Sequence, residues 1–150
     1  MRALSRMALL VVLSLLGSGC ASMYGASISV ARPEGAPAFT QQEQDRAKAI
    51  VVEIGRAERF TELDPLPSSS GYLPFVRLRG RDSEQDTVEV LGSMRRDRRE
   101  IVISIGDDSR GEPLPGTQKL VDDVRSALER AFPEARVAVE TRTKPRILGP

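Results

Sequence analysis

The hydrophobic and polar positions of the chain first take a helical pattern after residue 40. Apolar residues three and four positions apart form one stripe, and charged residues fill the other positions. The stripe consists of Ala47, Ile50, Val51, Ile54 and Ala57. Ahead of it, Thr40 and Glu43 fit a capping box, in which each side chain accepts a hydrogen bond from the backbone amide of the other residue. We therefore predict a helix from Gln41 to about Arg59.

Apolar and polar residues then alternate with a period of two in three segments, Tyr72–Arg79, Thr87–Gly92 and Glu100–Ile105. This alternation predicts strands with one buried face. The polar connections 80–86 and 95–98 are short enough for antiparallel hairpins, so we expect a meander. The preceding stretch 60–71 contains two prolines and three consecutive serines, and we expect a loop there.

A second helical stripe follows the meander. It consists of Leu120, Val121, Val124, Ala127, Leu128 and Ala131. We expect Thr117 to cap this helix and Pro133 to end it just after Phe132. Alternation returns in Arg136–Arg142, which predicts a fourth strand.

These elements predict an α+β domain over residues 40–143 in the order αβββαβ. Because each helix has one apolar stripe and each strand one apolar face, we expect a two-layer sandwich, with two helices on one face of a four-stranded, mostly antiparallel sheet. A right-handed crossover makes the last two strands parallel. The pattern does not decide whether the fourth strand lies beside the third or the first. The tail 144–150, with two prolines, is expected to be loose.

The first twenty residues have a different pattern. Arg2 and Arg6 precede an apolar run, Met7–Leu16, which is followed by Gly17, Ser18, Gly19 and Cys20. The run is too short to span a bilayer, which takes about 20 residues. A basic start, a short apolar middle and a small-residue end are typical of an export signal that is removed. We therefore assign residues 1–19 to a signal peptide.

The segment from Leu16 to Cys20 resembles the lipobox of bacterial lipoproteins. The resemblance implies that the sulfur of Cys20 receives a diacylglycerol and that Cys20 becomes the new N-terminus. Ala21 follows the cysteine. In well-studied lipoproteins an aspartate at that position retains the protein in the inner membrane, so alanine implies sorting to the outer membrane, with the domain facing the periplasm.

Residues 20–39 are predicted to be the lipidated cysteine and a flexible tether. Residues 21–38 are rich in Ala, Ser, Gly and Pro and have no helical period. As a flexible coil they would place the domain roughly 25 Å from the bilayer. Ile28 and Val30 alternate with serines, which leaves open a short strand that docks on the domain.

The amino-acid composition limits the kinds of binding and catalytic sites that the protein can have. Removing 19 of 150 residues leaves 131, enough for one ordinary domain. The chain has 22 Lys and Arg against 21 Asp and Glu, which is not the basic excess of a nucleic-acid binder. It has one cysteine and no histidine, which excludes an internal disulfide, Ser-His-Asp and Cys-His catalysis and the usual zinc sites. We therefore expect no cofactor and no enzymatic activity.

Two groups of residues remain as candidate binding sites. Arginines could make bidentate contacts with phosphate or carboxylate groups. They are Arg77, Arg79, Arg95, Arg96, Arg98, Arg99 and Arg142. The loop carboxylates Asp107, Asp108 and Glu112 could hold calcium or serve glycoside hydrolysis. Their spacing does not match an EF-hand, and aspartates are also common in ordinary turns.

The sequence thus leads to two hypotheses of function. The first is a non-enzymatic outer-membrane lipoprotein that binds another envelope protein, as an assembly factor or accessory subunit. The alternative is arginine-mediated binding of an anionic envelope polymer such as lipopolysaccharide or peptidoglycan. Both have the membrane as a partner through the lipid anchor.

Overall fold

The structure, a computed structural model, describes residues 22–67, 71–81, 87–109 and 112–145. The predicted signal peptide, Cys20, Ala21 and residues 146–150 lie outside this part of the chain. The described elements are β1 (Ser22–Ala31), α2 (Gln41–Ala57), β2 (Thr61–Leu63), β3 (Tyr72–Arg81), β4 (Thr87–Arg95), β5 (Glu100–Asp107), α3 (Pro115–Ala131) and β6 (Arg136–Pro145).

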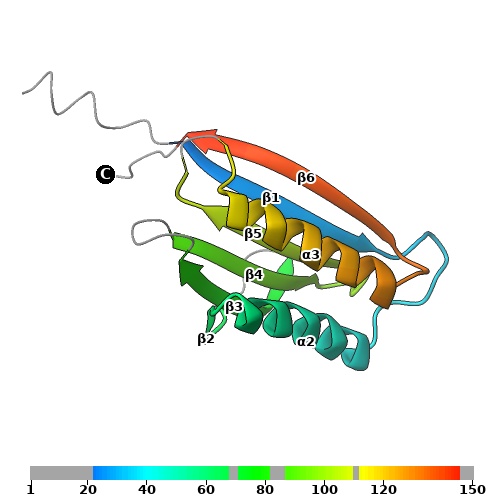
Figure 1. Ribbon diagram of the computed structural model, residues 1–150. Coiled ribbons are helices and arrows are strands. Elements are labelled where there is room, and N and C mark those ends of the chain that lie inside the picture. The colour runs from blue at the N-terminus through cyan, green and yellow to red at the C-terminus, as the bar shows by residue number, and fades with distance from the viewer. Residues whose placement is uncertain (1–21, 68–70, 82–86, 110–111, 146–150) are drawn as a thin grey trace, which may run out of the picture.

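The strands form one sheet in the order β2-β3-β4-β5-β1-β6, in which all neighbours are antiparallel. Both helices cover the same face of this sheet (Figure 1). The predicted α+β class and the placement of the helices are therefore confirmed. The predicted number of strands is wrong, because β1 and β2 add two strands to the four expected, and β1 lies inside the sheet.

β1 occupies the segment for which we predicted a flexible tether. It pairs with β5 on one side and with β6 on the other over almost its whole length. Ile28 and Val30 face the helices and are fully buried, and Tyr24 and Ala26 are buried on the same side. From Gly25 to Ala31 the opposite side carries only small residues, which gave the segment its linker-like composition. The alternative of a docked strand is the correct one.

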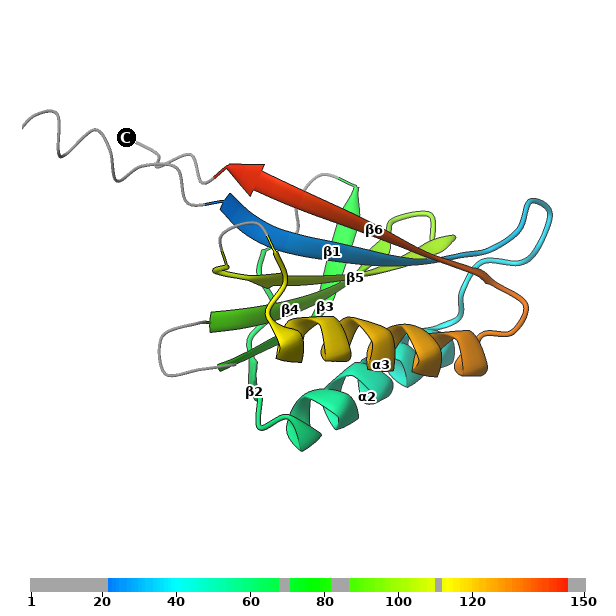
Figure 2. The same cartoon turned by 45° about the horizontal axis from the view of Figure 1, so that its top comes forward.

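The position of the last strand follows from β1. β6 pairs with β1, and both β5 and β6 are antiparallel to it, so β5 and β6 run in the same direction. The expected crossover through α3 is thus present, but β1 lies between the two parallel strands, in a split βαβ arrangement (Figure 2). β6 continues to Pro145, so the predicted loose tail begins within a strand.

The two helices begin in different ways. At α2 the predicted capping box is confirmed, since Thr40 Oγ1 accepts from the Glu43 amide at 3.2 Å and Glu43 Oε2 accepts from the Thr40 amide at 2.8 Å. α3 begins instead at Pro115, a residue suited to a first helical position because its missing N–H has no role there. The predicted cap Thr117 is wrong, because it lies fully buried inside the first turn.

The core fills the space between the sheet and the helices. A β-bulge between Pro74 and Val76 places both Phe75 and Val76 in this core, and Gly92 of β4 pairs with Val76. A Cβ atom on Gly92 would overlap Val76 Cγ1. Glycine at this position therefore makes room for the extra inward side chain that the bulge supplies. No helix in the described residues is long and apolar enough to cross a membrane.

Candidate functional site

The sheet face opposite the helices has small side chains at its centre. Both helices lie on the other face of the sheet (Figures 1 and 2). A hollow of about 630 Å³ opens there, lined in part by Ser27, Ser29, Ala31, Ser93, Ser104 and Ala138. These residues come from four strands, so the hollow crosses the middle of the sheet.

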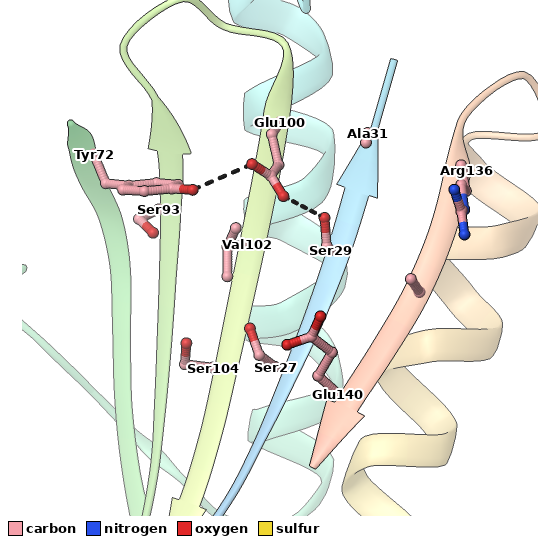
Figure 3. Close-up of a pocket in the computed structure, with 11 residues that line it drawn as sticks. Ser27, Ser29, Ala31, Tyr72, Ser93, Glu100, Val102, Ser104, Arg136 and Glu140 are labelled. Atoms are coloured by element: carbon pink, nitrogen blue, oxygen red, sulfur yellow. Dashed lines mark hydrogen bonds between the residues drawn. The ribbon is translucent and has the colours of Figure 1, made fainter. Parts of the chain in front are cut away.

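Glu100 is a charged group at one end of this hollow (Figure 3). Its Oε1 accepts from Ser29 Oγ at 2.5 Å, and its Oε2 accepts from Tyr72 Oη at 3.2 Å and from Arg95 Nη1 at 3.2 Å. Burial, followed by the Glu100 carboxylate, raises the pKa of Tyr72 above its ordinary value of 10.0. Three donors from three strands therefore fix the carboxylate in place.

A second hollow, of about 470 Å³, continues along the same face toward the end of β5. Its lining includes Gly25, Leu91 and Gly106. Because it shares Ser27, Ser104 and Glu140 with the first hollow, the two form one concavity along β1 and β5. We call this concavity the trough.

The prediction for this face was partly right. The period-two alternation of the predicted strands places Arg77, Arg79, Glu89, Ser104, Glu140 and Arg142 on the side away from the core, and the last four of these line the trough. The small residues at its centre were missed because most belong to β1, whose Gly25, Ser27, Ser29 and Ala31 were assigned to a tether. Their strict alternation with buried residues was the signal that could have identified them.

The three predicted arginines on β3 and β6 have carboxylate partners. Arg77 Nε donates to Glu89 Oε1 at 2.5 Å, and Arg79 lies 3.6 Å from the same oxygen. Arg142 Nη2 donates to Glu140 Oε2 at 2.9 Å. These arginines therefore balance neighbouring charge on the sheet, as cross-strand and same-strand pairs commonly do.

Two arginines of the β4–β5 hairpin bind the connection between β1 and α2. Arg98 Nε donates to the Phe39 carbonyl at 2.8 Å. Arg99 donates to the carbonyls of Ala36 and Pro33, at 2.8 and 2.7 Å. The hairpin thus satisfies backbone acceptors of a loop that lies far away in sequence.

The neighbouring Arg95 faces Asp97 and Glu100, and Arg96 carries an exposed side chain. The predicted arginine set therefore does not form a single surface. Arg95 and the β3 and β6 arginines belong to the open sheet face, whereas Arg98 and Arg99 hold the loop at the end of the sheet.

Sequence reasoning missed one buried arginine. Arg32 follows β1, its side chain is 9% exposed, and it pairs with Glu43. Its guanidinium lies 4.4 Å from the centre of the Phe39 ring, which in turn meets Phe132 edge to face at 5.7 Å. Arg32 thus joins β1 to the first turn of α2. No periodicity in the sequence marks it.

The loop carboxylates do not form a metal site. Asp107 is 1% exposed and accepts hydrogen bonds from the amides of Ser109 and Leu114, at 2.9 and 3.1 Å. Asp108 and Glu112 are exposed. Among the described residues, no three His, Cys, Asp or Glu side chains gather closely enough to hold an ion. Asp107 instead fixes the turn that leads into α3.

Comparisons with known proteins assign no family. No family model and no curated protein matches the sequence. Among solved structures, the fold is similar to the crystal structure of a hydantoinase/carbamoylase family amidase from Burkholderia ambifaria, with a TM-score of 0.41 and 11% sequence identity. The match covers 85% of this chain and 29% of the amidase chain.

Proposed function

We propose that this protein is a lipoprotein of the bacterial outer membrane that binds another envelope protein in the trough on its open sheet face. In this proposal Cys20 carries the lipid, the domain faces the periplasm, and no cofactor or catalysis is involved. The observation that carries the proposal is the trough itself, a long concavity over the centre of the sheet.

The side chains of the trough suit a protein partner. The solvated face of an antiparallel sheet usually carries polar side chains. Here serine, alanine and glycine on the central strands let the side chains of a partner approach the sheet closely. The serine hydroxyls and Glu100 supply hydrogen-bonding groups, and Leu91 and Val102 supply apolar contact. Such a mixture of apolar and polar groups is typical of non-obligate interfaces.

The place of β1 limits where that partner can be. Only two residue steps separate Cys20 from Ser22, the first residue of β1, and two steps span at most about 7 Å. A lipid on Cys20 would therefore hold the domain directly at the bilayer, instead of about 25 Å away on a flexible tether. We infer that the partner presents its binding segment at the membrane surface.

The alternative, arginine-mediated binding of an anionic polymer, has less support. Arg77, Arg95 and Arg142 already face carboxylates, and Arg98 and Arg99 face backbone carbonyls. A phosphate or carboxylate ligand would have to replace these contacts. A single ligand would also need these arginines on one surface. They lie on two, the open sheet face and the loop at the end of the sheet.

A matched pair of serine substitutions tests the trough. Ser104→Arg places a long side chain on its floor, whereas Ser126→Arg places the same side chain on the exposed surface of α3. The full-length variants are cross-linked in host cells and recovered from the membrane. We expect the wild type and Ser126→Arg to recover one envelope protein in stoichiometric amount, and Ser104→Arg to lose most of it.

Two results would contradict the proposal. Equal recovery of the partner by both variants would remove the trough as the binding site. Mass analysis of the native N-terminus would remove the membrane location if Cys20 were present without acyl chains.

A further inference from the structure

The outer edge of β6 is the long unpaired edge of this sheet. β6 runs for ten residues and pairs with β1 on one side, and no strand within the described residues pairs with its other side. At the opposite end of the sheet, β2 has three residues and pairs with Arg77–Arg79 of β3. A long edge strand offers a row of backbone N–H and C=O groups to another chain.

The side chains of β6 are self-complementary in one antiparallel register. Charges of both signs lie on its open-face side, where Glu140 is exposed between the exposed Arg136 and Arg142. If two copies pair with Thr141 opposite the partner's Thr141, then each Glu140 lies directly opposite the partner's Arg142. Opposite charges directly across an antiparallel pair are favourable, and like charges are not.

Neighbouring registers are less favourable. A two-fold axis at Glu140 or at Arg142 sets that residue against its own copy, so that like charges meet. An axis at Val139 sets Arg136 against the partner's Arg142. An axis at Ala138 pairs only residues 136–140 within the strand, whereas the axis at Thr141 pairs nine residues, from Val137 to Pro145.

We propose that two copies of this chain associate through their β6 strands, antiparallel, with the two-fold axis at Thr141. The two six-stranded sheets then form one continuous sheet, with the four helices on one face and both troughs on the other. The half-buried Val137 and Val139 at the edge lose their remaining exposure to water. Glu140 and Arg142 also line the trough. The proposed interface uses the outer edge of β6, however, and it does not depend on the function proposed above.

Cysteine cross-linking tests the register in the full-length protein, purified in detergent. Cys20 is the single cysteine of the wild type. The wild-type protein therefore shows how much disulfide-linked dimer Cys20 forms by itself. We expect Thr141→Cys to give a disulfide-linked dimer under mild oxidation, because facing residues lie within the Cα separation that a disulfide allows. Ala138→Cys is the matched control, since its two copies lie six residues apart along the strands, about 20 Å.

Equal cross-linking of the two variants, or of the wild type, would overturn the proposed register. Absence of cross-linking in a folded Thr141→Cys variant, verified by circular dichroism, would overturn the proposed dimer.

Charge reversal tests the same interface through affinity. Glu140→Arg sets arginine against arginine twice across the axis, and we expect the dimer dissociation constant from sedimentation equilibrium to rise about tenfold. Adding Arg142→Glu restores both opposite-charge pairs and should restore the affinity. Glu129→Arg, an equivalent reversal on the exposed surface of α3, should change nothing. A wild-type protein that stays monomeric at every concentration would refute the proposal.

Discussion

Arg98 and Phe39 are joined by two hydrogen bonds that run in opposite directions. The Phe39 amide donates to the Arg98 carbonyl at 2.7 Å, and Arg98 Nε donates to the Phe39 carbonyl at 2.8 Å. The residues are 59 positions apart. The contact therefore fixes the entry to α2 against the β4–β5 hairpin.

Replacement of Arg98 should destabilise the fold. Arg98→Ala leaves the Phe39 carbonyl without its charged donor, and we expect the free energy of unfolding in urea to fall by about 1.5–2 kcal/mol. The backbone at residue 98 is left-handed, with φ at 57°. Arginine and alanine are strained to a similar degree in this conformation, so the strain does not contribute to the difference in stability between the wild type and the variant. Arg130→Ala on the exposed surface of α3 serves as the control and should change stability little. A loss no greater than that of the control would show that the side chain is dispensable.

Two strand glycines should respond differently to alanine. At Gly92 the added Cβ overlaps Val76, and we expect a loss of about 1–3 kcal/mol of stability. At Gly25 the nearest atom to the added Cβ is the Arg142 carbonyl oxygen at 3.7 Å, an ordinary contact, so Gly25→Ala should be tolerated. Thermal unfolding of both variants checks this difference, and equal melting temperatures would contradict it.

Glu43 should make stability depend on acid pH. The hydrogen bond from the Thr40 amide, followed by the contact with Arg32, lowers the pKa of Glu43 below its ordinary value of 4.5. A lowered pKa in the folded state contributes stability that is present above pH 4.5 and is lost as the pH falls through the folded-state pKa. Glu43→Gln should therefore cost about 1 kcal/mol at pH 7 and almost nothing below the folded-state pKa. Urea unfolding at several pH values measures this, and a cost independent of pH would be contrary to it.

Glu100 should control the titration of Tyr72. The nearby carboxylate accepts a hydrogen bond from the neutral phenol and repels the phenolate, so both effects hold the pKa of Tyr72 up. In a Tyr24→Phe background Tyr72 is the remaining tyrosine, because the chain has two. Adding Glu100→Gln should lower the midpoint of the ultraviolet titration toward 10.0, the ordinary value, and burial should keep it above that value. An unchanged midpoint would mean that the carboxylate does not act on the phenol.

The helices and the meander could be predicted because their signals are local. Thr40 and Glu43 are three residues apart and define the start of α2 by themselves. The split crossover could be predicted only in part, since the direction of β6 follows from α3 but its neighbour depends on β1. β1 was missed because one of its faces carries only small residues from Gly25 to Ala31. Ser27 and Ser29 resemble a linker until Ile28 and Val30 are known to be buried.

The roles of the arginines could not be predicted in the same way. Arg98 and Arg99 donate to the backbone carbonyls of Pro33, Ala36 and Phe39. Every residue type has a backbone carbonyl, so the residue types in the sequence do not identify these partners. The sequence shows a run of positive charge but not the loop that folds back onto it. The trough was hidden for a related reason, since its floor is assembled from four strands and no single segment displays it.

The place of β1 in the sheet also constrains how the chain reaches its native state. The first strand to leave the ribosome pairs with β5 and β6, which are made last, so these contacts close loops of roughly 70 to 120 residues. Such distant pairing slows folding and makes it depend on the whole chain. The polypeptide can therefore complete its native sheet only after its final strand has been made.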